Sequence, residues 1–112
     1  MPSKVRAALR HILYHIDLAA QSVTSCDHLA FSNDLRTVYA VTRRLEIISQ
    51  ASRRLPDELK ARHPPIPWNS IAGAGNIYRH DDEDIAARYV GETTQRDLPI
   101  LRNVTVAETA RP

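Results

Sequence analysis

Three polar residues with the chemistry needed to cut RNA lie close together in the last third of the sequence: Asn76, Arg79 and His80. A histidine can take the proton from a 2′-hydroxyl group. An arginine can stabilise the charge that builds on a phosphate, and an asparagine can orient either side chain. These three residues taken alone are also typical of a polar, solvent-exposed helix end, and that simpler interpretation is favoured until further residues are considered.

The residues just before this trio are unusually small. Ala72, Gly73, Ala74 and Gly75 carry almost no side-chain bulk, and a helix with such a strip allows a second helix to approach closely. We therefore expect the polar residues that follow to lie near a partner helix.

Helices account for the whole sequence pattern. Apolar residues at three- and four-residue steps predict a long helix from Lys4 to about Ser25 and a second from a cap at Ser32 or Asn33 to about Leu55. A short helix over 57–62 follows Pro56, and another begins at Trp68 and runs to about Tyr78. A last helix follows Asp81 and Asp82 and is kinked or restarted at Pro99, and 104–112 is expected to be a fraying tail. The prediction is an all-α, antiparallel bundle of four to five helices.

Length and composition are those of one soluble domain. The 112 residues are 43% hydrophobic and 25% charged, which fits a single globular domain over 1–112. No apolar run is long enough to cross a membrane. The single cysteine, Cys26, cannot form an internal disulfide, which favours the reducing cytoplasm.

Positive charge is concentrated in the second half of the second long helix, at Arg43, Arg44, Arg53 and Arg54. Such a cluster can attract a phosphate backbone, so these four are candidate RNA-binding residues. Ordinary solvated helix surface would give the same pattern and is the safer interpretation from charge alone.

Other residues that could carry chemistry have weaker support. His11 and His15 share a helix face but have no evident third ligand, and Gly73 and Gly75 do not follow a strand as a phosphate-binding loop requires. No metal and no cofactor is therefore expected. Ser49 and Ser52 fit ordinary surface serines, while Trp68 is expected to anchor a core or a dimer interface.

Four segments together carry a family resemblance. Ile66–His80 reads IPWNSIAGAGNIYRH, Arg53–Leu59 reads RRLPDEL, Leu45–Arg54 reads LEIISQASRR, and Asp97–Arg102 reads DLPILR. In this order and spacing they resemble the HepT-like proteins of the HEPN superfamily. The resemblance implies a helical HEPN domain, a homodimer, and metal-independent cleavage of RNA. It also implies a toxin of a type VII-like HEPN/MNT toxin–antitoxin system, whose partner is an MNT-type nucleotidyltransferase antitoxin.

The sequence departs from the family pattern at two positions. The motif arginine expected before His80 is replaced by Gly75, so Arg79 would have to supply the cation. The tyrosine that the antitoxin adenylylates in some members is replaced by Asp82, which leaves Tyr78 as a candidate modification site. Two hypotheses therefore stay open: an active endoribonuclease with a degenerate motif, and a catalytically silent binding partner of the nucleotidyltransferase.

Overall fold

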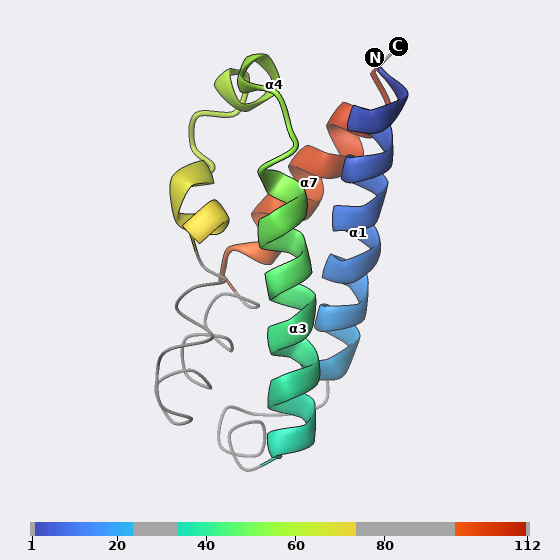
Figure 1. The fold of residues 1–112 in the computed structure, drawn as a ribbon, viewed down its shortest axis with the longest axis vertical. Coiled ribbons are helices and arrows are strands. Elements are labelled where there is room, and N and C mark those ends of the chain that lie inside the picture. The colour runs from blue at the N-terminus through green and yellow to red at the C-terminus, as the bar shows by residue number, and fades with distance from the viewer. Residues whose placement is uncertain (1, 24–33, 74–95, 112) are drawn as a thin grey trace.

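The computed structural model describes residues 2–23, 34–73 and 96–111 (Figure 1). These contain helices α1 (Ser3–Val23), α3 (Leu35–Ser52), α4 (Asp57–Ala61) and α7 (Leu98–Thr109), and residues 68–73 are also helical. All regular secondary structure within these ranges is helical, which confirms the all-α prediction. No helix in them is both long and apolar enough to cross a membrane.

The two long helices, α1 and α3, run antiparallel side by side, and α7 packs against α1 (Figure 1). Both chain ends lie at the same end of this assembly. Arg6 of α1 donates from its guanidinium to the backbone oxygens of Thr109 and Arg111, each at 3.1 Å. The first and last described segments are thus tied together, and the segment with residues 68–73 lies on the other side of α3 from α1.

The core consists of the apolar stripes that the sequence predicted. Burial along one face of each long helix removes apolar surface from water, which is the main driving force for packing them together. The buried positions on the two long helices include Leu9, Ile12, Ile16, Ala19, Val38, Val41, Leu45, Ile48 and Ala51. Ala20, which lies four residues after the buried Ile16, is exposed.

Helix α3 begins one or two residues later than the predicted caps, Asn33 and Ser32, would place it. Asp34 is the N-cap, because its carboxylate accepts hydrogen bonds from the backbone N–H of Thr37 at 3.3 Å and from that residue's hydroxyl at 2.7 Å. This is the usual way in which an aspartate satisfies an unpaired N–H group in the first turn. The helix ends at Ser52, and the extended Pro56 then opens α4.

The expected fraying tail over 104–112 is wrong for most of its length. Helix α7 continues to Thr109, and Pro99 lies in its first turn, where a missing N–H costs nothing. Its buried residues are Leu98, Leu101, Thr105 and Glu108, which recur at steps of three and four and form one helix face. Because Thr105 and Glu108 are polar, the sequence pattern did not indicate that this buried helix face continues through them.

Candidate functional site

Residues 68–73 are helical and lie directly before the segment that holds the predicted catalytic trio. The backbone N–H of Ile71 donates to the oxygen of Pro67 at 3.0 Å, and the helix begins at Trp68 as predicted. Trp68 is partly buried against the core, and its indole N–H is shared between the backbone oxygens of Lys60 and His63, each at 3.1 Å. Trp68 thus fixes the start of this helix to the segment after α4, as expected of a core anchor.

The other end of the same helix is held by α3. The hydroxyl of Ser49 donates to the backbone oxygen of Ala72 at 2.9 Å, and Arg53 donates to that oxygen from Nε at 3.0 Å and Nη2 at 2.6 Å. The N–H donors of a guanidinium lie in a fixed planar arrangement. Two of them bound to one oxygen therefore fix the orientation of the contact as well as its length. Ser49 of α3 and the C-cap residue Arg53 therefore direct three donors at a carbonyl that lies four residues before Asn76.

Asn76, Tyr78, Arg79 and His80 lie outside the described residues, as do Gly75 and Asp82. Gly73 is described, and a Cβ atom built on it would meet nothing within 4 Å. Among the described residues, none therefore makes the close approach at Gly73 that the small-residue strip led us to expect.

The four predicted RNA-binding arginines do not form one cluster. Arg44 and Arg53 are nine residues apart, about two and a half helical turns, and so point to opposite sides of α3. Arg44 reaches His15 of α1, whereas Arg53 is bound to Ala72. Arg43 pairs with Glu46 on the surface at 3.3 Å. Only Arg43 and Arg54, which are about three turns apart, share a side of the helix.

His15 lies in the interface between the two long helices. Its Nδ1 accepts from Nη1 of Arg44 at 3.1 Å, since a guanidinium can only donate. The ring of His11 packs edge-on against it, with 4.5 Å between centroids. Burial, followed by the nearby His11, Arg44 and Arg43, lowers the pKa of His15. The bond from Arg44 and the lowered pKa both favour the neutral ring, so this histidine serves packing in the folded protein.

A metal site at His11 and His15 would need at least one further ligand beside the two rings. No group of three or more His, Cys, Asp or Glu side chains that could hold a metal ion is present in the described ranges.

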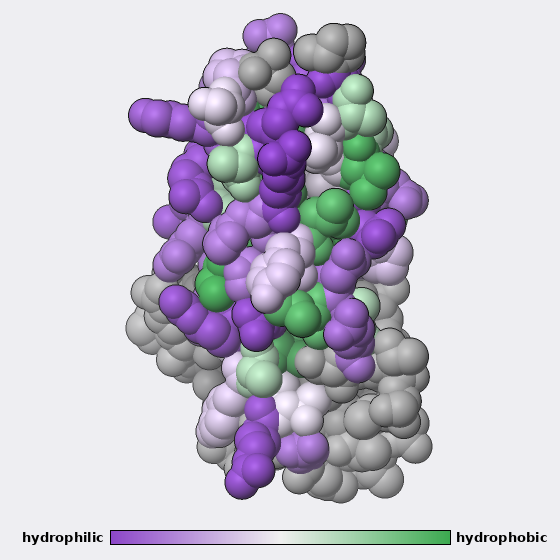
Figure 2. Space-filling model, turned by 90° about the vertical axis from the view of Figure 1, so that its right-hand side faces the viewer, coloured by the Kyte–Doolittle hydropathy of each residue, from purple (hydrophilic) through white to green (hydrophobic). Residues whose placement is uncertain are grey.

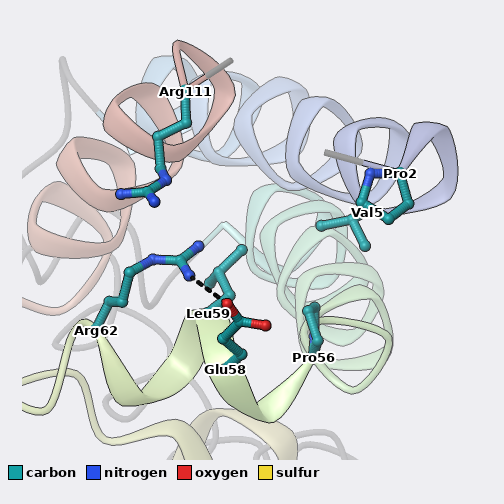
Figure 3. A pocket seen from close by; sticks show the side chains of 7 residues that line it. All are labelled: Pro2, Val5, Pro56, Glu58, Leu59, Arg62 and Arg111. Carbon is teal, nitrogen blue, oxygen red and sulfur yellow. Dashed lines mark ion pairs between the residues drawn. The ribbon is translucent and has the colours of Figure 1, made fainter.

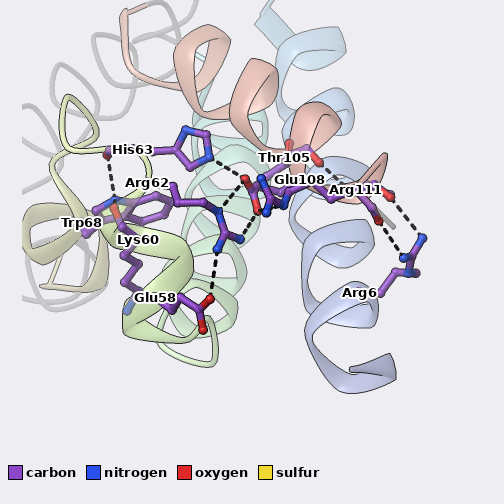
Figure 4. A network of polar contacts seen from close by, with 10 residues as sticks. Arg6, Glu58, Lys60, Arg62, His63, Trp68, Thr105, Glu108 and Arg111 are labelled. Carbon is purple, nitrogen blue, oxygen red and sulfur yellow. Dashed lines mark hydrogen bonds and ion pairs between the residues drawn. The ribbon is translucent and has the colours of Figure 1, made fainter. Parts of the chain in front are cut away.

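A buried carboxylate that the sequence pattern did not reveal joins α7 to the segment after α4 (Figure 4). Glu108, only 2% exposed, accepts from Nη2 of Arg62 at 2.5 Å and lies 2.8 Å from Nε2 of His63. The hydrogen bond from Arg62 is the main cause that lowers the pKa of Glu108, against a smaller upward effect of burial. The same pairing raises the pKa of Arg62. This cluster fixes the chain that leads into Trp68.

A pocket of about 380 Å³ adjoins this cluster at the end where the chain termini meet (Figure 3). Its lining mixes charges of both signs, because Arg62 pairs with Glu58 at 3.7 Å along α4 and Arg111 projects from the end of α7. The remaining lining is apolar or proline: Pro2, Val5, Pro56 and Leu59. Both arginines are paired with glutamates, Arg62 with Glu58 and Glu108 and Arg111 with Glu108, so the pocket shows no clear preference for an anion or a cation.

Comparison with known proteins gives a consistent result over almost the whole chain. Residues 7–107 match the family described as "Ribonuclease HepT-like". A protein of Thermococcus cleftensis named "Probable ribonuclease HepT" is 36% identical over 72 residues, which cover 64% of this chain and 66% of that protein.

Two further relatives align over more of their length. A "Putative RNase" of Caldanaerobacter subterraneus is 31% identical over 96 residues, which cover 86% of each chain. A "Putative RNase" of Methanocaldococcus jannaschii is 28% identical over 103 residues, covering 91% of this chain and 89% of that protein. No solved structure matches the chain. The family match spans all the described helices from α1 to most of α7, and the chain belongs to the HepT-like ribonuclease family.

Proposed function

We propose that the chain is a metal-independent endoribonuclease, the toxin of a HEPN/MNT toxin–antitoxin system, with His80 as its principal catalytic residue. The observation that carries this proposal is the family match over residues 7–107, which includes Asn76, Arg79 and His80. The bonds from Ser49 and Arg53 to Ala72 support it, because they fix the helix that enters this segment.

The reaction needs only groups that the chain supplies. His80 takes the proton from a 2′-hydroxyl, the 2′-oxygen attacks the adjacent phosphorus, and the bond from phosphorus to the 5′-oxygen breaks. The products are a 2′,3′-cyclic phosphate and a 5′-hydroxyl. Arg79 stabilises the charge on the phosphate during this exchange, and Asn76 orients the pair. In a two-fold homodimer the second copy's His80 supplies the proton to the departing oxygen, which is the reason for proposing a dimer.

Cleavage of a labelled single-stranded RNA by the purified protein in the presence of EDTA tests this function. Removal of a general acid–base group costs about 10²–10⁴-fold, so His80→Ala should abolish visible cleavage and leave the helical content unchanged. An RNA with 2′-O-methyl groups should not be cut, because it has no attacking hydroxyl. Equal cleavage by the wild type and by His80→Ala would refute the catalytic assignment.

The antitoxin is proposed to be a nucleotidyltransferase encoded beside this chain, and Tyr78 is the candidate residue for its adenylylation. Growth arrest on expression of this chain should be relieved when the neighbouring nucleotidyltransferase is expressed with it. Tyr78→Phe should leave the arrest in place but prevent its relief if modification at that tyrosine is the mechanism. Unchanged relief with this variant would indicate inhibition by contact or at another residue.

Gly75 at the position of the motif arginine favours a second candidate function. A chain without that cation could act as a silent binding partner of the nucleotidyltransferase. Gly75→Arg separates the two cases. If the wild type is inactive and this variant cuts RNA, the natural protein is a decayed toxin. If the wild type cuts RNA and Arg79→Ala abolishes the activity, Arg79 has replaced the missing arginine.

A further inference from the structure

A pocket of about 600 Å³ opens between the first half of α1 and the turn that follows α3. It is lined by Lys4, Ala7, Ala8, His11 and Arg54. Every polar side chain among these is a cation or can become one, and no acidic residue is among them. The two alanines leave space in which an anion can come close to the three polar groups.

Two of the cations in this pocket are not neutralised by the protein. Lys4 and Arg54 form no ion pair or side-chain hydrogen bond in the part of the chain that the structure describes. The acidic residues of the long helices are engaged elsewhere: Asp17 pairs with Arg102 of α7 at 2.8 Å, and Glu46 pairs with Arg43. The pocket therefore presents positive charge that a bound anion could neutralise.

Further positive charge continues along the same side of the helix pair. Arg43 lies about three turns before Arg54 on the same side of α3, and its neighbour Arg44 points to His15 of α1. Eleven residues of helix extend about 16 Å, which accommodates more than one phosphate of a nucleic acid strand. Arg43 is free to exchange partners, because an exposed ion pair such as that with Glu46 is worth only about 0–1 kcal/mol. Figure 2 shows the side of the molecule on which α1 lies, where hydrophilic side chains predominate.

We propose that this pocket, which we call the α1–α3 basic pocket, binds a phosphate of the RNA strand. Lys4 supplies a point charge, Arg54 supplies a fork that can hold two phosphate oxygens, and the His11 ring donates a further hydrogen bond. The positive charge extends from the pocket toward Arg43. This favours a nucleic acid strand over a single small anion, because a small anion would need only the one group of cations in the pocket. The proposal rests on the proposed function for the identity of the nucleic acid, and it adds a binding site made of α1 and α3 residues to the catalytic segment.

The test measures binding separately from cleavage. The affinity of the full chain for a fluorescein-labelled 2′-O-methyl RNA, which cannot be cut, is measured by anisotropy between 50 and 200 mM salt. The variant Lys4→Gln/Arg54→Gln removes the two unpaired cations of the pocket. The matched control, Arg10→Gln/Lys60→Gln, also removes one lysine and one arginine, from exposed or partly exposed positions that do not line this pocket.

The pocket variant should bind about tenfold more weakly at low salt. The slope of log K against log salt should become shallower by about 0.7 for each phosphate that the variant no longer neutralises. The control should stay within about twofold of the wild type. Unchanged binding by the pocket variant would overturn the proposal. So would equal weakening of both variants, because the protein would then respond only to total charge.

Two further measurements separate the remaining outcomes. Inorganic phosphate is titrated while the NMR signals of the His11 ring are followed. If phosphate shifts these signals but the pocket variant binds RNA normally, the pocket takes a small anion and the proposal for RNA fails. If the wild type binds RNA through the pocket but cuts no unmodified RNA, the proposed nuclease function fails and the binding site stands. Both substituted side chains are exposed, and the single variants Lys4→Gln and Arg54→Gln provide the same test if the double variant is unstable.

Discussion

The backbone oxygen of Ala72 accepts two hydrogen bonds from the guanidinium of Arg53, from Nε at 3.0 Å and from Nη2 at 2.6 Å. This contact joins the end of α3 to the helix that leads into the proposed catalytic segment. An arginine predicted to attract RNA is thus engaged with the protein's own backbone. Its role is to position the residues that follow, and that role can be separated from substrate binding.

Arg53→Lys keeps the positive charge but loses the pair of guanidinium donors that binds the backbone oxygen of Ala72. A displacement of about 1 Å at a reacting group can cost on the order of a hundredfold in rate, so the single-turnover rate of RNA cleavage should fall by about ten- to a hundredfold. The affinity for uncleavable RNA and the urea midpoint of unfolding should change little. Arg10→Lys, on the exposed side of α1, is the control. A wild-type cleavage rate in Arg53→Lys would contradict the positioning role.

The apolar part of the fold could be predicted from the sequence because burial follows helical periodicity. Leu9, Ile12 and Ile16 recur at steps of three and four and are all buried, as are Val41 and Ile48 on the facing helix. In each case the side chain alone determines the preference for burial, because burying an apolar group is favourable wherever its helix packs.

Buried polar residues could not be predicted in the same way. Ser49 and Ser52 were expected on the surface, yet both are buried. Their hydroxyls donate to the backbone oxygens of Ala72 and Ser49, respectively, at 2.9 and 2.7 Å. A buried polar group is tolerated only when it finds a partner, and the partner of Ser49 lies 23 residues further along the chain. Local sequence does not reveal such a pairing.

The buried carboxylate of Glu108 should contribute far more stability than the exposed carboxylate of Glu58, although both face Arg62. Hydrogen bonds to charged groups are worth about 1.5–3 kcal/mol, so Glu108→Gln should lower the free energy of unfolding by about that amount. Glu58→Gln removes a solvated pair and should cost about 0–1 kcal/mol. Urea unfolding with unchanged m-values measures both. Equal effects of the two substitutions would contradict this assignment of Glu108.

The pH dependence of the Glu108 contribution follows from its lowered pKa. A carboxylate with a lower pKa in the folded protein stabilises it above the pKa of the unfolded chain, about 4.3, and loses this effect as the pH falls through the folded value. The difference in stability between the wild type and Glu108→Gln should therefore be constant from about pH 7 to 5 and shrink below that. A difference that persists unchanged at acidic pH would exclude ionic stabilisation.

His15 should make the protein less stable under mildly acidic conditions. Its pKa is lowered in the folded state, so the unfolded chain binds the proton more readily. Stability is then complete above the unfolded pKa of about 6.5 and decreases as the pH falls toward the folded value. His15→Gln should show a flatter dependence of the unfolding midpoint between about pH 7.5 and 5. Arg10→Gln, at an exposed position on the same helix and not among the groups that lower the pKa of His15, should retain the wild-type slope.

Removal of residues 105–112 distinguishes a structural α7 from the flexible tail that the sequence suggested. The truncation deletes the buried Thr105 and Glu108 and the backbone oxygens that bind Arg6. It also leaves Arg62 without its buried carboxylate partner. The hydrogen bonds to charged groups that it removes are worth about 1.5–3 kcal/mol each, so the free energy of unfolding should fall by at least about 3 kcal/mol. Removal of 110–112 alone deletes none of the described buried residues and should cost much less. Similar unfolding midpoints for the two truncations would indicate that the end of α7 does not support the fold.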